Sequence, residues 1–443
     1  MEEKFDLVVV GSGTTGSTVA SKCRAAGWSV AVIDSLPFGG TCALRGCDPK
    51  KVLVGAAELI DFSARLREKR TVTGQLSIDW SKLIQFKRSF TAPIPRQKEE
   101  SFEKAGITNL HGRAKFVGPR SLEVAGRRLD AKHFVIAAGA RPAILGISGE
   151  EHLINSTQFL ELDRLPTEIA FVGGGYIAME FAHIAVRAGA RVSVLHRGAR
   201  VLEGFDPDLV AALSGRTQEL GIRLHTETVV EGIEKVGTKF VLHAKSRGKE
   251  LSISCDLAVH AAGRVPDIDE VERMEEGVRV NDYLQSVSNP AVYAGGDAAA
   301  TSGLPLTPVA GYDGKVIAAN LLDGNQQKAE YNAIPTVVFT IPPLASVGLS
   351  EETAMQTGLR ARKNHAQIGG WYSSRRVAEK TAAFKVLIEE GSDRILGAHL
   401  LGPAAEETIN LFALAMREGM TAKALKGALF SYPTHASDVQ YML

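Results

Sequence analysis

The chain has 443 residues, of which 45% are hydrophobic and 23% charged, a composition that suits a globular protein with sizeable cores. With 51 Lys and Arg against 50 Asp and Glu, its net charge of +1 gives no electrostatic reason to expect nucleic acid or an anionic membrane as principal partner. No apolar run reaches spanning length, the N-terminus resembles no signal or transit peptide, and cysteines are few. The expected compartment is therefore the reducing cytoplasm.

The first predicted elements form a nucleotide-binding unit. A strand over 5–10 leads through a glycine-rich turn into a helix, and a second strand over 30–33 ends in Asp34. The turn carries three glycines in the spacing of the dinucleotide fingerprint, namely Gly11, Gly13 and Gly16. Such glycines let the backbone approach a pyrophosphate at the helix N-terminus, and the acid binds ribose hydroxyls.

The next stretch contains two of the four cysteines, Cys42 and Cys47, five residues apart. On a regular helix they would lie about 140° apart around the axis, so a bridge needs a distorted turn, for which Gly46 supplies backbone freedom. Asp48-Pro49 resembles an N-cap followed by proline, which places Cys47 at a helix N-terminus where a thiolate is favoured. A reactive pair is the preferred interpretation over two buried free cysteines, and the spacing argues against a structural metal site.

A second strand and glycine-rich turn follow at 169–175. The residue 23 positions beyond the first glycine is an aspartate in the first unit but His196 here. This unit lacks the acid that binds a free 2′-hydroxyl and offers Arg197 and Arg200, which suit a 2′-phosphate. NADPH is therefore predicted over NADH. If the two arginines instead form a solvated face, the choice between NADPH and NADH stays open.

Two dinucleotide units around a dithiol match a chemistry in which nicotinamide delivers a hydride, a flavin accepts it and a disulfide takes the electron pair. Over essentially its whole length the chain resembles class I of the FAD-dependent pyridine nucleotide-disulfide oxidoreductases, which include glutathione reductase, dihydrolipoamide dehydrogenase and mercuric reductase. The resemblance implies an α/β fold with two Rossmann-like, three-layer FAD and NAD(P) domains and a C-terminal α+β dimerisation domain. The expected domains are 1–150 with 266–330 for FAD, 151–265 for NAD(P), and 331–443 for the homodimer interface.

The resemblance also implies roles for individual residues. Cys42 would exchange with substrate, and Cys47 would lie against the flavin as a charge-transfer thiolate. Lys50 would sit near flavin N5 and pair with Glu180, while Tyr176 would cover the flavin until nicotinamide displaces it.

Further segments match the cofactor sites. Gly139 would approach the cofactor closely, and Asp297 would hold the ribityl and pyrophosphate region, although by itself it only caps a following helix. The residues expected to bind FAD are Gly11, Gly13, Gly16, Asp34, Gly40, Thr41, Gly139, Asp297, Pro308, Val309 and Ala310. Those expected to bind NADP are Gly173, Gly175, Tyr176, Ile177, Arg197, Arg200 and Gly263.

The C-terminal segment departs from the family pattern. Where glutathione reductase and dihydrolipoamide dehydrogenase carry a histidine followed by an acid, this chain has Tyr432 and Ser437. With a reference pKa near 10, tyrosine is a poor base around neutral pH. Two explanations stay open. Either His435 and Asp438 shift into the place of the base, or reduction of the substrate requires less proton transfer.

The acceptor is consequently not fixed. Mercuric reductase also carries tyrosine near this position, but it uses a C-terminal cysteine pair that is not found here, and Val19 and Lys315 stand where glutathione reductases tend to use arginine. The first prediction is NADPH-dependent reduction of a small disulfide through Cys42 and Cys47. The alternatives are a mercuric-ion or other metal or electrophile reductase, a diaphorase or quinone reductase, and a flavin-bearing redox sensor.

Asp48 is the second departure, because the family usually has an apolar residue after the charge-transfer cysteine. Its carboxylate either caps the following helix alone or also lies near the dithiol, where it would disfavour anionic substrates.

Overall fold

The computed structural model describes residues 2–268 and 277–443. Within these residues the contacts divide the chain into two compact units. The first unit comprises Met1–Lys50, Gln85–Ala143 and Gly263–Tyr331. The second comprises Lys51–Ile84, Ile144–Ala262 and Asn332–Leu443. These are packing units, and the predicted domain boundaries stay predictions.

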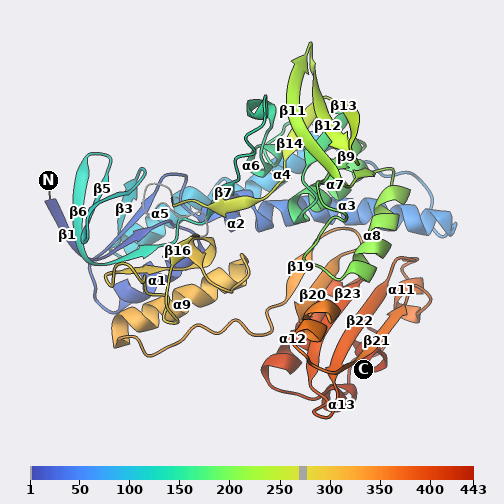
Figure 1. Cartoon of the computed structure of the whole chain (residues 1–443). Helices are drawn as coiled ribbons and strands as arrows, with labels where there is room; N and C mark the ends of the chain where they lie inside the picture. Colours follow the sequence, from blue (N-terminus) through green and yellow to red (C-terminus); the bar gives the residue numbers. More distant parts are fainter. Residues whose placement is uncertain (1, 269–276) are drawn as a thin grey trace. The chain divides into compact units, whose positions relative to one another are not determined.

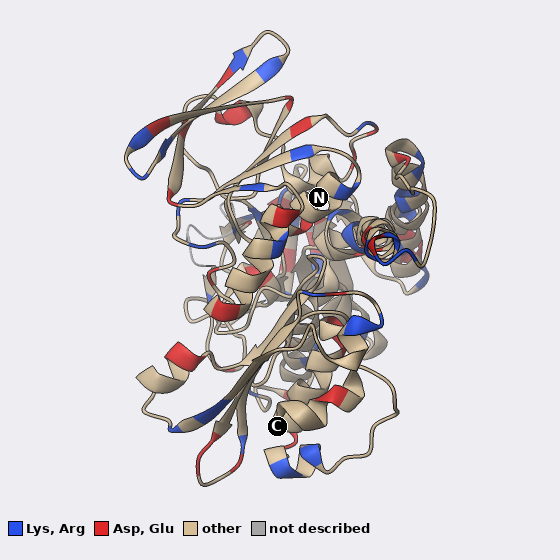
Figure 2. Ribbon diagram, turned by 90° about the vertical axis from the view of Figure 1, so that its right-hand side faces the viewer, with Lys and Arg blue, Asp and Glu red and all other residues tan. Residues whose placement is uncertain are grey.

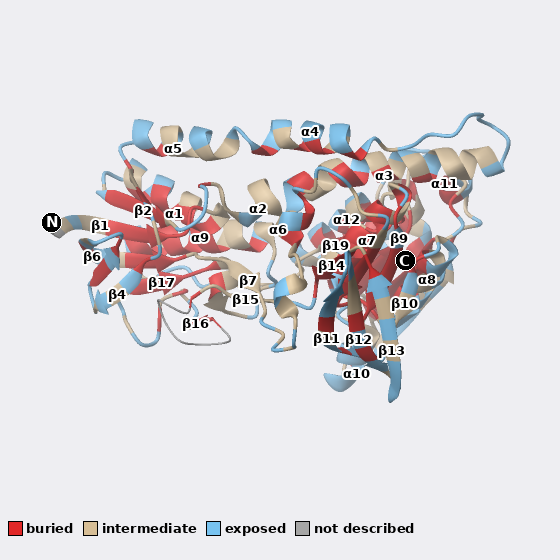
Figure 3. Cartoon of the chain, turned by 90° about the horizontal axis from the view of Figure 1, so that it is seen from above, coloured by how far each residue is buried: buried red, intermediate tan, exposed pale blue. Residues whose placement is uncertain are grey.

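A twisted sheet forms the centre of the first unit. Its strands lie in the order β3 (Thr108–His111), β2 (Val30–Asp34), β1 (Glu2–Val10), β6 (Arg127–Ile136), β5 (Ser121–Val124) and β4 (Lys115–Gly118), with β17 (Val292–Ala294) paired to β6. The pairs β1–β2, β1–β6 and β6–β17 are parallel, as a crossover fold requires. The central strands are buried along both faces (Figure 3), which explains their near-continuous Val and Ile runs.

Helices α1 (Thr14–Ala25) and α9 (Thr307–Asp323) lie side by side against this sheet (Figure 1). The Thr15 hydroxyl of α1 donates to the Ala310 carbonyl of α9 at 2.8 Å. Val19 and Cys23 of α1 pack with Val316 and Ile317 of α9 under the sheet. Cys23 is therefore a core residue, and the same is true of Cys255 in the second unit.

The rest of the first unit consists of short elements around the sheet. They are α2 (Gly40–Arg45), α5 (Ile94–Lys104), the pair β7 (Ala140–Pro142) and β15 (Arg264–Pro266), the pair β16 (Val278–Arg279) and β18 (Ala299–Ala300), and η2 (Gly296–Ala298). Helices α3 (Cys47–Glu68) and α4 (Trp80–Thr91) contribute residues to both units.

The second unit contains a parallel sheet in the order β10 (Arg223–His225), β9 (Arg191–Leu195), β8 (Glu168–Val172) and β14 (Leu257–His260). Helices α7 (Tyr176–Arg187) and α8 (Pro207–Glu219) follow β8 and β9, after α6 (Ser156–Phe159) and η1 (Glu150–His152). An antiparallel sheet of β11 (Thr228–Val236), β12 (Lys239–Ser246) and β13 (Lys249–Cys255) is joined to it. This βαβ repeat agrees with the predicted second nucleotide unit.

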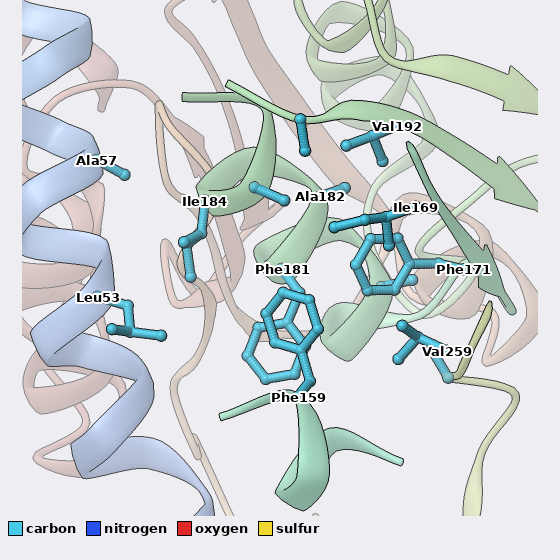
Figure 4. Packing of buried hydrophobic residues seen from close by; sticks show 14 of the residues in the cluster. Leu53, Ala57, Phe159, Ile169, Phe171, Phe181, Ala182, Ile184, Val192 and Val259 are labelled. Carbon is cyan, nitrogen blue, oxygen red and sulfur yellow. The ribbon is translucent and has the colours of Figure 1, made fainter. Parts of the chain in front are cut away.

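Aromatic packing connects this sheet to α3. Phe159 and Phe181 stack with ring centroids 4.6 Å apart, and Phe171 packs beside Phe159 at 5.7 Å. Leu53 and Ala57 of α3 point into the same cluster (Figure 4). The helix that begins at Cys47 is thus held in a hydrophobic core along its later turns.

The C-terminal part of the second unit is an antiparallel sheet in the order β19 (Thr336–Val338), β20 (Leu344–Gly348), β23 (Ile395–Leu401), β22 (Ala383–Glu389) and β21 (Ala361–Gln367). Helix α12 (Ala405–Arg417) packs on it. The shorter helices are α10 (Glu351–Gln356), α11 (Tyr372–Arg375), α13 (Ala422–Lys426), η3 (Ala436–Asp438) and α14 (Val439–Met442). This arrangement agrees with the predicted α+β domain.

A buried ionic network also ties the second unit together. Asp61 of α3 accepts hydrogen bonds from Arg187 Nη2 at 2.6 Å, Arg65 Nε at 2.7 Å and Arg216 Nη2 at 3.2 Å. Asp61 and Arg187 side chains are each only 3% exposed. The neighbouring arginines lower the pKa of Asp61 even though burial opposes ionisation. The network therefore fixes α3 against α7 and α8.

Acidic and basic residues are interspersed along the ribbon in Figure 2, in keeping with the balanced composition. In residues 2–268 and 277–443 no helix is both long and apolar enough to cross a membrane.

Candidate active site

The two cysteines flank a break between helices. Helix α2 ends at Arg45, and Gly46, with φ −139° and ψ −117°, interrupts the helical backbone before α3 begins at Cys47. A Cβ on Gly46 would lie 2.9 Å from the Thr41 carbonyl oxygen, so the turn needs a glycine here. Both cysteines are thiols, Cys42 half-buried and Cys47 exposed. The predicted distorted turn and the helix-terminal position of Cys47 are confirmed.

Each sulfur has a polar neighbour. Cys42 Sγ donates to Asp48 Oδ1 at 3.7 Å, and Cys47 Sγ lies 3.7 Å from Thr307 Oγ1 at the start of α9. The pKa of the Cys42 thiol is raised, first by its hydrogen bond with Cys47, then by burial, with the Asp48 charge adding to the effect. These contacts favour the protonated form of Cys42, and a hydrogen bond from Thr307 opposes them.

The N-cap prediction for Asp48 is wrong. Because α3 already begins at Cys47, Asp48 is the second residue of the helix, in its first turn. Gly46 breaks the backbone two residues earlier than the Asp48-Pro49 signal indicated. The other expectation, that Asp48 lies near the dithiol, agrees with its contact to Cys42.

The turn between β1 and α1 is built for close backbone approach. Gly11 has φ +105°, and a Cβ there would lie 2.1 Å from the Ala137 carbonyl oxygen. A Cβ on Gly16 would lie 1.9 Å from the Gly11 oxygen. Both positions exclude a side chain, because the obstruction is backbone. This leaves the N-terminus of α1 available for an anionic group.

Asp34 is held beside the same turn. Its Oδ2 accepts from the Ser12 amide at 2.9 Å and from the Ser12 hydroxyl at 2.6 Å. The Ser12 oxygen also accepts from the Gly39 amide at 2.9 Å, and a Cβ on Gly40 would lie 2.5 Å from Gly13 Cα. The fingerprint turn and the segment leading to Cys42 are therefore side by side, as a shared flavin site requires.

The other expected FAD residues also belong to the first unit. Gly139 has φ +72°, and a Cβ there would meet no heavy atom of the described chain within 4 Å, so its backbone faces open space. Burial raises the pKa of Asp297 in η2, and the Arg264 charge opposes this. Thr41 is exposed on α2, and α9 begins with Thr307 followed by Pro308, Val309 and Ala310. Gly263, expected at NADP, lies in this unit as well.

The second glycine turn repeats the first. Gly173 has φ +116°, and a Cβ there would lie 2.1 Å from the Ala261 carbonyl oxygen. Gly175 precedes α7, whose first residues are Tyr176, 47% exposed, and Ile177. Glu180 is 1% exposed and accepts from the Phe339 amide at 2.8 Å. Because Lys50 belongs to the other unit, its pairing with Glu180 stays a prediction.

An acid near the second turn was missed from the sequence. Glu203 Oε1 lies 3.3 Å from His196 Nε2, and its backbone oxygen accepts from Arg200 Nη2 at 2.7 Å. Arg200 Nε is buried without a hydrogen-bond partner among the described residues, whereas Arg197 is exposed. Glu203 follows the expected acid position by seven residues, so fixed spacing could not find it. The site therefore combines cationic groups with one carboxylate.

Near the C-terminus, Tyr432 is 78% exposed. Burial lowers the pKa of His435, and the Asp438 charge opposes this. Burial likewise raises the pKa of Asp438, which accepts a hydrogen bond from the Ser373 hydroxyl. His435 and Asp438 therefore interact electrostatically within this unit, while Tyr432 projects toward solvent.

Comparison with known proteins matches residues 5–314 to the pyridine nucleotide-disulphide oxidoreductase model and residues 334–443 to the dimerisation domain of that family. The chain is 30% identical to a mercuric reductase from Lysinibacillus sphaericus, over 99% of this chain and 82% of the relative. It is 32% identical to a glutathione reductase from Burkholderia cepacia, over 98% of this chain and 97% of the relative.

A shorter relative is more similar in sequence. An uncharacterized 19.7 kDa protein in a mercuric resistance operon of Staphylococcus aureus is 56% identical over 39% of this chain and 96% of its own length. Among solved structures, the Cu(II) complex of the HOCl-induced flavoprotein disulfide reductase RclA from Escherichia coli shares the fold, with a TM-score of 0.88, 24% identity and 99% coverage of both chains. The chain belongs to the pyridine nucleotide-disulphide oxidoreductase family.

Proposed function

We propose that this protein is a cytoplasmic, homodimeric, NADPH-dependent flavoenzyme that reduces a small disulfide through Cys42 and Cys47. The observation that carries the proposal is the cysteine pair itself. Cys47 opens helix α3, Cys42 lies just before it, and the segment leading to them packs against the fingerprint turn through Ser12 and Gly40. The matched dimerisation domain supports a homodimer.

The residues of the first unit fit FAD. The backbone at Gly11 and Gly16 leaves no room for side chains, Gly139 faces open space, and Asp34 is oriented by Ser12. FAD bound there would supply hydride acceptance from NADPH and two-electron transfer to the cysteine pair.

Disulfide reduction then uses the two sulfurs in order. The Cys42 thiolate attacks one sulfur of the substrate, forms a mixed disulfide and releases the first thiolate. Cys47 attacks Cys42 Sγ, releases the second thiolate and leaves the two cysteines joined as a disulfide. Both released thiolates take up protons, so one disulfide and two electrons yield two thiols.

NADPH is favoured by the cations beside the second turn. Arg197 is exposed, and Arg200 carries a buried Nε that lacks a partner among the described residues. A 2′-phosphate would accept from both guanidinium groups. Glu203 opposes this preference, because its carboxylate lies 3.3 Å from His196 and suits a free ribose hydroxyl.

A second candidate is reduction of a soft metal ion such as Hg²⁺. It is favoured by the Asp48 carboxylate beside Cys42, which suits a cationic acceptor, and by the absence of a histidine at position 432. Two relatives support it by name, one a mercuric reductase and one a protein in a mercuric resistance operon. Thiolates bind such ions directly, so less proton transfer is needed.

An acceptor screen tests both candidates. NADPH oxidation is measured with glutathione disulfide, lipoamide, other biological disulfides, mercuric ion and quinones, for the wild type and for Cys42→Ser. A matched control is Cys255→Ala, which changes a buried core cysteine. We expect a disulfide to give the highest kcat/KM and Cys42→Ser to abolish it. An activity that survives Cys42→Ser would refute the proposal, and mercuric ion as best acceptor would establish the second candidate.

The same screen assigns the proton donor. Tyr432→Phe is compared with His435→Ala on the best acceptor, since Tyr432 is exposed and the Asp438 charge acts on the pKa of His435. The variant with the larger loss of kcat identifies the group.

A further inference from the structure

We propose that Asp48 selects the acceptor: its carboxylate keeps the proton on the Cys42 thiol and favours neutral or cationic acceptors over anionic disulfides. The inference rests on the proposed function for its substrate class, and on the contact between Asp48 and Cys42 for its mechanism.

The first step is the direction of the hydrogen bond. Asp48 is exposed, and its Oδ1 lies 3.7 Å from Cys42 Sγ. An ionised carboxylate can only accept, so the thiol must donate. As long as Asp48 carries its charge, the arrangement is satisfied only when Cys42 keeps its proton.

The second step concerns the reduced pair as a whole. Removing one proton from the two thiols leaves one negative charge, which avoids the sulfur that faces a carboxylate. Cys47 stands at the N-terminus of α3, next to the Thr307 hydroxyl, and both features stabilise a thiolate. Asp48 thus assigns the charge to Cys47 and leaves Cys42 as a thiol until an acceptor arrives.

The third step extends this to the substrate. An acceptor must bring its reacting sulfur to Cys42, and therefore brings its substituents close to Asp48. Carboxylates on the acceptor are repelled there, whereas ammonium groups or a metal cation are attracted. Because Asp48 is exposed, the effect should weaken as salt concentration rises.

The test uses a charge series of small disulfides with similar skeletons. Cystamine is dicationic, hydroxyethyl disulfide is neutral and dithiodiglycolate is dianionic. We expect wild-type kcat/KM to fall in that order, and Asp48→Asn to reduce the ratio between cystamine and dithiodiglycolate by about tenfold, the effect of roughly 1.4 kcal/mol. The ratio in the wild type should also fall when the salt is raised.

A second readout needs neither cofactor turnover nor a known substrate. The protein is reduced with a phosphine, and the rate of Cys42 alkylation by iodoacetamide near neutral pH is followed by peptide mass spectrometry. Asp48→Asn should increase this rate roughly five- to tenfold, because the thiolate of Cys42 becomes easier to form. A merely structural role would leave the rate unchanged or lower it.

Controls make each outcome decisive. Glu58→Gln removes the same charge from the same helix, where Glu58 pairs with Lys51 at 3.3 Å, and should change neither readout. Asp48→Ser provides a second variant if Asp48→Asn unfolds. Equal alkylation rates, or an unchanged ratio of kcat/KM between cystamine and dithiodiglycolate, would overturn the proposal. If the wild type reduces none of these disulfides, the proposed function fails, while the alkylation rates still decide whether Asp48 holds the proton.

Discussion

The two nucleotide-binding turns share a backbone and differ in the side chains beside it. Gly11 and Gly173 have φ of +105° and +116°, and a Cβ on either would lie 2.1 Å from a carbonyl oxygen of the neighbouring strand's end. Beside the first turn Asp34 accepts two hydrogen bonds from Ser12. At the matching position of the second turn stands His196, paired with Glu203.

This comparison indicates that the backbone and the side chains of the turns have different roles in dinucleotide binding. The backbone geometry at the glycines, which we propose lies against a pyrophosphate, is the same in both units, and any dinucleotide presents that group. The side chains decide which dinucleotide is bound, since they meet the ribose and its substituents. Changes in the glycines should therefore abolish binding, and changes at the side chains should shift preference.

Gly11→Ala should have the largest effect. The added Cβ meets the Ala137 backbone, which cannot move aside without shifting β6, so we expect protein purified without flavin absorbance. The control is Gly27→Ala, at φ +92° with no described atom within 4 Å of the Cβ, which adds strain of roughly 1–2 kcal/mol and no clash. Equal FAD content in the two variants would contradict the proposal that the backbone at Gly11 lies against FAD.

Gly173→Ala should impair binding of NADPH but not of FAD, which distinguishes the second turn from the first. Its Cβ meets the Ala261 oxygen in the second unit, so bound FAD is retained while the KM for NADPH rises more than about tenfold, as for lost charged hydrogen bonds. Gly189→Ala is the matched control, at φ +98° with no described atom near the Cβ. Stopped-flow measurement of flavin reduction by NADPH gives the effect. Unchanged kinetics would indicate that NADPH does not bind at this turn.

The helices that follow the two glycine turns, α1 and α7, are held by different contacts, and removing these contacts should destabilise the protein by different amounts. Arg187 at the end of α7 is buried against Asp61, whereas Arg24 near the end of α1 donates to the Ala105 and Trp28 carbonyls. Asp61→Asn leaves the buried Arg187 without its paired carboxylate and should lower the free energy of unfolding by about 3–5 kcal/mol. Arg24→Gln should cost about 1 kcal/mol. Urea unfolding gives both values, and similar losses would contradict the contrast.

The same network predicts acid sensitivity. The folded-state pKa of Asp61 is lowered, so the stability it contributes is present above the unfolded pKa of about 3.9 and is lost as pH falls through the folded value. Wild-type unfolding free energy should therefore decrease in that acidic range, and the decrease should be smaller in Asp61→Asn.

Substitutions of the side chains beside the second turn should change which coenzyme is preferred. Arg197→Ala should lower kcat/KM for NADPH roughly 10- to 50-fold and leave NADH nearly unchanged, because only NADPH offers a 2′-phosphate. Glu203→Gln should raise the NADPH to NADH ratio about threefold, in line with a modest charge effect at an exposed carboxylate. Equal losses with both coenzymes in Arg197→Ala would refute the assignment.

The sequence predicted what is local in the chain. Strand, glycine turn and helix occur in register within each unit, so both turns and the cysteine pair could be found from spacing. The start of the helix after the cysteines was predicted two positions too late, because Gly46 breaks the backbone earlier than expected.

Contacts made over long sequence distances could not be found in this way. Thr307 is 260 residues from Cys47, and nothing in its local pattern marks it as a neighbour of a thiol. Glu203 reaches His196 because the loop after β9 folds back, which places its carboxylate where Gly198 has no side chain. Leu53 and Ala57 follow the cysteine segment closely in sequence but pack with residues more than 100 positions away in the core of the second unit.

In the proposed reaction Cys47 faces the flavin and Cys42 faces the acceptor, and two-electron reduction of the enzyme distinguishes these roles. The absorbance spectrum is recorded during anaerobic titration of the FAD-loaded wild type, Cys42→Ser and Cys47→Ser. We expect a long-wavelength charge-transfer band in the wild type and in Cys42→Ser, and its loss in Cys47→Ser. A wild type with bound FAD that shows no band, or a band that survives Cys47→Ser, would refute the assignment of Cys47 to the flavin side.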